Sequence, residues 1–98
     1  MHVPHTIESV DALILESFPA HIRLAVKGYQ PDGCDAPVHI AQSREQNSVK
    51  VEIYRELPAD TICPMLAKEF QTDIDLDGSF ASGTYTIDVN GTVVTVKI

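Results

Sequence analysis

The stretch that decides the fold is the C-terminal one, residues 83–98, which reads "GTYTIDVNGTVVTVKI". Apolar side chains recur at every second position on both sides of Asn90-Gly91, and this period of two is typical of a strand with one buried face. The apolar positions are Tyr85, Ile87 and Val89 before the pair, and Val94, Val96 and Ile98 after it. Asn-Gly is the strongest short hairpin signal because both turn residues take a positive φ. The stretch therefore predicts a β-hairpin with Asn90 and Gly91 in its turn.

The same period of two recurs upstream. It predicts a strand at residues 22–26, two strands at 38–42 and 49–53 joined by a turn at 45–48, and a strand at 70–76. Residues 6–17, "TIESVDALILES", are also β-prone, but four successive apolar residues at 12–15 break the alternation, and we expect a bulge there or a strand that passes between sheets. Helix signals are weak, the best being one or two turns after Pro64. About seven short strands predict an all-β protein, an antiparallel β-sandwich.

Size and composition predict one globular domain. The chain has 98 residues, of which 44% are hydrophobic and 21% charged, as in ordinary globular proteins. We expect a single domain over residues 1–98, with residues 1–7 frayed. No apolar run approaches the roughly 18 residues that a membrane helix needs, so we expect a chain that does not span a membrane. The net charge of −7, with the basic residues scattered singly, argues against nucleic acid as a partner.

The two cysteines, Cys34 in "PDGCDAP" and Cys63 in "TICPM", lie in turn-rich segments. In the cytosol two such residues are more often unpaired, and they lack the close spacing of a redox or zinc motif. A disulfide between two loops fits their setting better. It would stabilise a small domain by roughly 3 kcal/mol in an oxidising compartment.

Three aspartates at alternate positions, Asp73, Asp75 and Asp77, precede a glycine, as in the first half of an EF-hand calcium loop. Thr84 stands where that loop needs a bidentate glutamate, and the flanking helices are not predicted. In an extended strand neighbouring carboxylates of this set lie about 6.6 to 7 Å apart, too far to share an ion without a bend. A strand with a wet face explains the triplet better. We expect no metal and no cofactor, and the triplet is only a weak metal candidate.

Other residue types that carry chemistry also have ordinary explanations. Among the histidines, two fall in the terminus expected to fray and two on the polar face of strands, where surface placement is usual; they are His2, His5, His21 and His39. "GSFASG" is not the Gly-x-Ser-x-Gly elbow and precedes a strand where that elbow requires a helix. Glu52 and Glu56 share a solvated face. We therefore expect no catalytic residues and no enzyme.

Two resemblances extend this interpretation. "ASGTYTI", residues 81–87, resembles the start of strand F in immunoglobulin-like domains, where the tyrosine hydroxyl anchors a corner to nearby backbone. The resemblance implies that role for Tyr85. Ile87 stands where antibody domains have a cysteine, and the chain has no tryptophan, so the fold it implies is a broader Ig-like or fibronectin-like sandwich.

From about Ser9 onward the chain resembles a group of small, uncharacterised bacterial secreted proteins or lipoproteins. The shared marks are Pro-Asp-Gly-Cys after the second strand, Pro-Ala-Asp before the second cysteine, and Gly-Thr-Tyr-Thr before Val-Asn-Gly. The chain departs from the group at Tyr29-Gln30, where a leucine often precedes the Pro-Asp. The resemblance implies an exported Ig-like domain, secreted, periplasmic or lipid-anchored, with Cys34 bonded to Cys63. It supplies no activity.

These observations favour a non-enzymatic extracytoplasmic module that binds or scaffolds a protein or cell-envelope partner. The candidate binding loop consists of Tyr29, Gln30, Pro31, Asp32 and Gly33, within residues 28–37. The alternative is a protease inhibitor that presents this loop, because a pre-ordered loop loses less entropy on binding. The chain lacks the loop motifs of chagasin-like inhibitors, which weakens that alternative.

Overall fold

The computed structural model describes residues 1–15 and 19–98. Their regular structure is entirely β, and no helix occurs among them. In chain order the strands are β1 (His2–Pro4), β2 (Thr6–Leu15), β3 (His21–Gln30), β4 (His39–Glu45), β5 (Ser48–Glu56), β6 (Lys68–Asp75), β7 (Thr84–Val89) and β8 (Thr92–Lys97). The predicted all-β sandwich is confirmed, with eight strands in place of about seven. The weak helix candidate after Pro64 does not form a helix, since residues 61–67 form an irregular connection. None of the described residues belongs to a helix long and apolar enough to cross a membrane.

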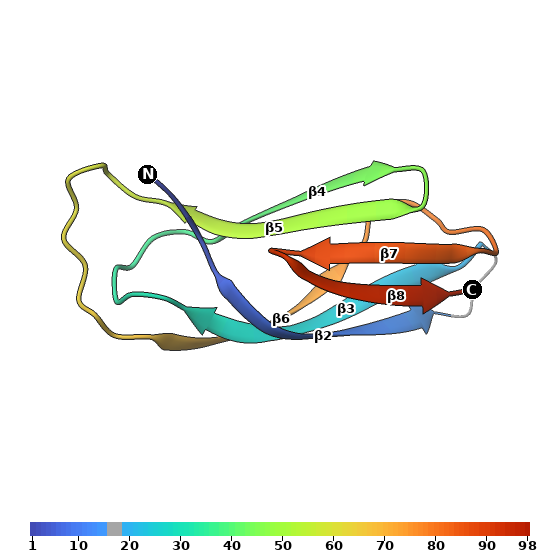
Figure 1. The fold of residues 1–98 in the computed structure, drawn as a ribbon, viewed down its shortest axis with the longest axis horizontal. Helices are drawn as coiled ribbons and strands as arrows, with labels where there is room; N and C mark the ends of the chain where they lie inside the picture. Colours follow the sequence, from blue (N-terminus) through green and yellow to red (C-terminus); the bar gives the residue numbers. More distant parts are fainter. Residues whose placement is uncertain (16–18) are drawn as a thin grey trace.

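The strands form two sheets that face each other (Figure 1). The three-stranded sheet has the order β2-β3-β6, and both of its pairings are antiparallel. In the five-stranded sheet β4 pairs with one edge of β5. The other edge of β5 is shared by two strands, β7 beside residues 48–51 and β1 beside residues 54–56. β8 pairs with the far edge of β7. The β5–β7 pairing is parallel, so this sheet is mixed, where the sequence had predicted antiparallel pairing. Alternation of side chains marks strands but not their direction, which is why the pattern did not reveal this pair.

The core lies between the sheets and consists of the residues that the period of two placed inward. The fully buried side chains include Ile22, Leu24, Val26, Val51, Ile53, Phe80, Ile87 and Val89. The C-terminal hairpin forms as predicted, with Asn90 at φ 50° and Gly91 at φ 91° in its turn. The turn between β4 and β5 uses the same left-handed region, with Gln46 at φ 54°.

Asn90 also completes the five-stranded sheet. At Ile53 the edge of β5 passes from β7 to β1, and the Asn90 side chain lies in the gap. The Ile53 N–H donates to Asn90 Oδ1 over 2.9 Å, and Asn90 Nδ2 donates to the carbonyls of Ile53 and His5, both over 2.8 Å. The His5 N–H donates to the same Ile53 carbonyl over 2.9 Å. One amide thus joins β5, the β1–β2 junction and the last hairpin, whereas the sequence analysis gave Asn90 only a turn role.

The N-terminal residues are paired, which corrects the expectation that residues 1–7 fray. β1 adds to the edge of β5, the chain crosses to the other sheet at His5, and β2 begins at once. The irregularity of β2 is a shift between Ile7 and Ser9, opposite Gly28, and not at residues 12–15, which pair regularly with β3. A Cβ on Gly28 would lie 2.0 Å from the Thr6 carbonyl oxygen, so glycine allows this close approach. Residues 16 and 17 of the expected strand lie outside the described residues.

The corner before β7 is fixed by aromatic contacts. The Tyr85 hydroxyl donates to the Ala81 carbonyl over 2.8 Å, and the Tyr85 ring meets Phe80 edge to face at 5.1 Å between centroids. The Arg44 guanidinium of β4 lies 4.2 Å from the centre of the Phe80 ring, close enough for a cation–π contact. The molecule is elongated, 47 × 22 × 18 Å, and the connections after β3 and β5 lie together at one end (Figure 1).

Candidate functional site

The predicted binding loop lies at the end of the sandwich where the connections after β3 and β5 meet (Figure 1). Tyr29 and Gln30 are the last two residues of β3 and pair with Glu69 and Lys68 of β6, so they are strand residues and not loop residues. The true loop begins at Pro31. We call residues 31–38 together with residues 57–67 the loop end.

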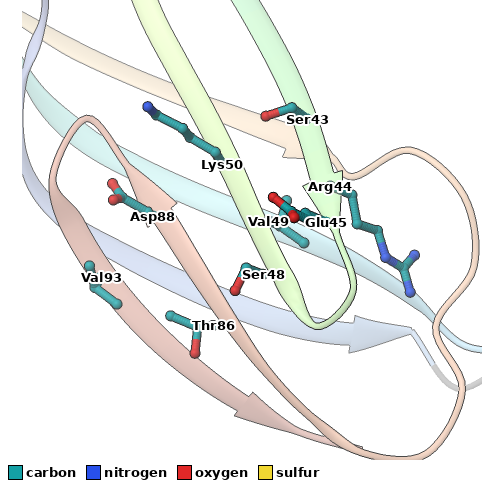
Figure 2. Close-up of a pocket in the computed structure, with 9 residues that line it drawn as sticks. All are labelled: Ser43, Arg44, Glu45, Ser48, Val49, Lys50, Thr86, Asp88 and Val93. Carbon is teal, nitrogen blue, oxygen red and sulfur yellow. The ribbon is translucent and has the colours of Figure 1, made fainter.

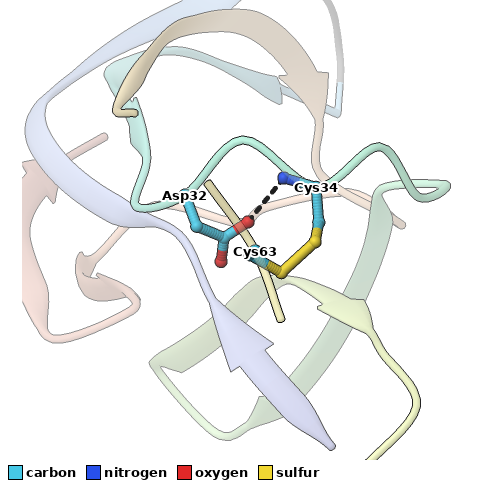
Figure 3. Close-up of side chains that lie close together, drawn as sticks. All are labelled: Asp32, Cys34 and Cys63. Carbon is cyan, nitrogen blue, oxygen red and sulfur yellow. Dashed lines mark hydrogen bonds between the residues drawn. A yellow bond between two sulfur atoms is a disulfide. The ribbon is translucent and has the colours of Figure 1, made fainter. Parts of the chain in front are cut away.

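The disulfide between Cys34 and Cys63 joins the two segments of the loop end (Figure 3). The S–S distance is 2.03 Å and the Cα atoms lie 5.1 Å apart. A backbone hydrogen bond of 2.9 Å from the Gly33 N–H to the Pro64 carbonyl runs beside it. The two connections are therefore tied to each other by a covalent bond and a hydrogen bond.

A buried arginine of β5 anchors the first segment of the loop end to the sheet. Arg55 of β5 is fully buried, and its two terminal nitrogens donate to the two carboxylate oxygens of Asp32, each over 2.9 Å. Arg55 also donates to the Cys34 carbonyl over 2.8 Å, while the Cys34 N–H donates to Asp32 over 3.0 Å. The side-chain amide of Gln30 donates to the carbonyls of Asp32 and Cys34. Asp32 and Gln30 thus order the loop, and their polar atoms face inward.

The arginine lowers the pKa of the Asp32 carboxyl below its usual range, chiefly through the paired hydrogen bonds. The ionised form of Asp32 is therefore the one that holds the loop. The role of Arg55 was not predicted from the sequence. Its signal was present, because Arg55 shares the inward parity of Val49, Val51 and Ile53.

His5 lies close to this pair and is also buried, with 2% of its surface exposed. Its ring meets the Phe70 ring edge-on at 4.6 Å. Burial and the nearby Arg55 charge lower the pKa of His5, partly offset by Asp32. Within the described residues neither ring nitrogen of His5, nor Nε of Arg55, has a hydrogen-bond partner. The histidine is therefore held neutral among apolar and cationic neighbours, and it is not the exposed terminal residue that the sequence predicted.

Large apolar side chains are exposed on the second segment of the loop end. Ile62 is 94% exposed, Met65 is fully exposed and Leu66 is 58% exposed. They flank Cys63 and Pro64, which the disulfide and the Gly33 hydrogen bond hold in place. Large apolar side chains that project from a fixed connection are candidates for burial against a partner. The segment that was predicted as the binding loop therefore holds the second segment of the loop end in place through the disulfide. The exposed apolar side chains, Ile62, Met65 and Leu66, belong to that second segment.

The candidate metal ligands are distributed over several sites. Asp73 and Asp75 lie on the exposed face of β6, where Asp75 accepts a 2.7 Å hydrogen bond from Arg23, while Asp77 lies beyond the strand. Arg23 lowers the pKa of the Asp75 carboxyl, chiefly through that bond. Within the described residues the one group of potential ligand atoms close enough for a metal is Asp32, Cys34 and Cys63, and the disulfide uses both of its sulfurs.

Two histidines instead flank an aromatic ring on the outer face of the five-stranded sheet. His2 of β1 stacks on Tyr54 at 4.2 Å, and His39 of β4 stacks on the same ring at 5.4 Å. His2 also contacts Glu56 at 3.1 Å. These contacts join three adjacent strands and give the exposed histidines a structural role.

An open hollow of about 620 Å³ lies on the outer face of the same sheet (Figure 2). Side chains of β4, β5, β7 and β8 line it, among them Ser43, Ser48, Lys50, Thr86 and Asp88. A second hollow of about 340 Å³ shares Lys50 and Asp88 and extends towards β1. Hydroxyl, carboxylate and ammonium groups of this kind can hydrogen-bond a polar ligand, but they surround an open sheet surface and not a closed pocket.

Comparisons with known proteins agree with the sandwich architecture. The sequence model of the ORF11 β-sandwich domain family matches residues 24–98. An uncharacterised 10.2 kDa protein from the HgiCIIM 5′ region of Herpetosiphon aurantiacus is 34% identical over 92 residues, which cover 94% of this chain and 98% of that protein. A second 10.2 kDa protein, from the HgiBIM 5′ region of the same organism, is 32% identical over 82 residues, 84% of this chain and all of that protein. No solved structure matches the chain.

Proposed function

The chain belongs to the ORF11 β-sandwich domain family, and we propose that it is a non-enzymatic, extracytoplasmic binding module that docks a protein partner on its loop end. The observation that carries the proposal is the exposure of Ile62, Met65 and Leu66 on a segment fixed by the Cys34–Cys63 disulfide.

The apolar group supplies the binding free energy in this proposal. Burying apolar surface stabilises a complex by about 25 cal/mol per Å², so three large side chains contribute on the order of several kcal/mol before the cost of association. The disulfide and the Arg55–Asp32 pair reduce that cost, because the loop is already ordered when the partner arrives. The partner chemistry that fits is a protein surface with an apolar pocket.

The disulfide supports an oxidising compartment, since such bonds persist in secreted and periplasmic proteins and are rare in the cytosol. The hydrogen bonds made by the buried ionisable groups support the non-enzymatic part of the proposal. Asp32 and Arg55 satisfy each other and the loop backbone, which is a structural task.

The test compares binding by a loop variant and a control variant. The loop variant carries Ile62→Ser, Met65→Ser and Leu66→Ser; the control carries Leu13→Ser and Val93→Ser, which replace exposed apolar residues outside the loop end. A photo-crosslinking residue at position 65 is used to capture a partner in the source cells, the captured protein is purified, and its dissociation constant is measured with each variant. We expect at least a tenfold loss for the loop variant and none for the control. Equal affinities would refute the proposed surface.

Two further measurements separate the parts of the proposal. Thiol labelling of the protein in intact cells is expected to find no free thiol, and two reactive thiols without reductant would contradict the extracytoplasmic location. A panel of cysteine and serine proteases tests the inhibitor alternative. Inhibition at about micromolar concentration that is lost in the loop variant would identify the partner class as a protease.

A further inference from the structure

The edge of β4 offers a second interaction surface, separate from the loop end. β4 is an outer strand of the five-stranded sheet, and its backbone pairs with β5 alone among the described residues (Figure 1). The hairpin closes at Glu45 and Ser48, so the residues that exchange hydrogen bonds with β5 are those at 45, 43, 41 and 39. The N–H and C=O groups of Ile40, Gln42 and Arg44 therefore point away from the sheet and have no strand partner.

The other outer strands are protected against edge pairing more fully than the first part of β4. β6 carries four charged residues, Lys68, Glu69, Asp73 and Asp75. β8 lies beside β2, and Thr92 Oγ1 donates to the Ile7 carbonyl over 3.0 Å. In β4 the charged residues are confined to its end, Arg44 and Glu45, and residues 38–43 contain neither a charged side chain nor a proline, which are the usual devices against edge pairing.

The inward side of β4 is also incompletely covered. Ile40 is 43% exposed, although its parity in β4 directs it towards the core, and Val38, just before the strand, is 40% exposed. The opposite sheet ends at β6, and side chains of β4 reach across the gap. The Gln42 amide donates to the Asp75 carbonyl over 3.0 Å and accepts from the Asp77 N–H over 2.9 Å, and Arg44 donates to the Ser79 carbonyl over 2.8 Å. A strand added beside β4 would cover Ile40 and satisfy the free backbone groups together.

We propose that β4 pairs antiparallel with β4 of a second copy of this chain, which joins the two five-stranded sheets across a two-fold axis. β4 spans His39–Glu45, so an axis at its midpoint, Gln42, pairs all seven residues. This register sets Ile40 opposite Arg44 of the second copy, and both present free backbone groups to the axis. It also sets His39 opposite Glu45 of the second copy on the outer face, an opposite-charge pair when the histidine is protonated. Like charges do not meet, so a second copy is an occupant that this edge fits.

Pairing along one strand buries less surface than a stable dimer needs, so the association is weak and depends on concentration. Sedimentation velocity of the purified chain, up to about 1 mM, is expected to show a monomer–dimer equilibrium. Hydrogen exchange at the same concentrations is expected to slow at the amides of 40, 42 and 44 and to leave the alternate amides unchanged.

Ile40→Pro removes one free N–H per copy without removing a bond to β5, and we expect it to weaken the dimer at least tenfold. Ile40→Lys keeps the backbone and places a positive charge opposite Arg44 of the second copy, so it should also give a monomer. Leu13→Thr, on an exposed residue elsewhere, is the control and should leave the dissociation constant unchanged. A monomer at all concentrations would overturn the proposal. A dimer that survives both Ile40 variants would also overturn it, and loss of that dimer in the Ile62, Met65 and Leu66 variant would place the contact at the loop end.

Discussion

Replacing Asn90 by glycine should destabilise the protein by about 2 to 4 kcal/mol. Glycine adopts the φ of 50° without strain, so the substitution removes the side-chain amide and little else. Three hydrogen bonds are lost, those to the Ile53 N–H, the Ile53 carbonyl and the His5 carbonyl. The Ile53 carbonyl keeps its bond from the His5 N–H, which leaves two groups unpaired at roughly 1 to 2 kcal/mol each. For a domain of this size the expected fall in melting temperature is about 8 to 20 °C.

Chemical and thermal unfolding followed by far-ultraviolet circular dichroism measures this change. Gln46→Gly is the matched control, because Gln46 has a similar φ of 54° in the other hairpin and its side chain makes no hydrogen bond within the described residues. The control should stay within about 1 kcal/mol of the wild type. If Asn90→Gly and Gln46→Gly give the same stability, the amide does not connect the strands and the account of the five-stranded sheet is wrong.

Four further results are expected. Burial keeps His5 neutral in the folded protein, so below about pH 6.5 the unfolded state binds one proton more than the folded state. The melting temperature of the wild type should therefore fall from pH 7 to pH 5 more steeply than that of His5→Phe. Equal slopes for the two proteins would contradict a buried, neutral His5. The double variant Cys34→Ser, Cys63→Ser should lose about 3 kcal/mol in urea unfolding, and an unchanged midpoint would show that the disulfide adds no stability. Gly28→Ala places a methyl group against backbone and should fail to give a cooperative melting transition, whereas a wild-type melting curve would refute the close approach of β2. Tyr85→Phe should lower the free energy of unfolding by about 1 kcal/mol, because the hydroxyl bond to the Ala81 carbonyl is lost; an unchanged stability would show that this bond does not stabilise the corner.

The alternation of side chains was sufficient to predict most of the strands and their buried faces, but not β1, which lies in the terminus expected to fray. Residues such as Ile22, Val51 and Ile87 are buried because a strand with one wet face has no other arrangement, and the Asn90-Gly91 turn follows from local backbone conformation. Which strands become neighbours is decided by contacts distant in sequence. The parallel β5–β7 pair and the addition of β1 to β5 therefore had no local signal.

The loop end, too, could be predicted from the sequence only in part. Its location and the cysteines could be predicted from the sequence, because turn residues and "PDGC" mark a bend. The inward parity of Arg55 was visible as well, but its pairing with Asp32 joins residues 23 apart and depends on the fold. The exposure of Ile62, Met65 and Leu66 could not be predicted, since apolar residues in a loop are usually covered and only the three-dimensional structure shows that these are not.

The hydrogen bond between Asn90 and the His5 carbonyl links residues 85 apart, and this separation bears on how the protein is made. A ribosome adds about 5 to 20 residues per second, so several seconds pass between synthesis of the first strand and synthesis of the asparagine. In the later part of that interval, once residues 48–56 have been made, a nascent chain has β1 and β5 without the amide that spans them. The final register of the larger sheet is therefore set after translation has almost ended, and a chain stalled before position 90 is expected to remain a substrate for chaperones and proteases.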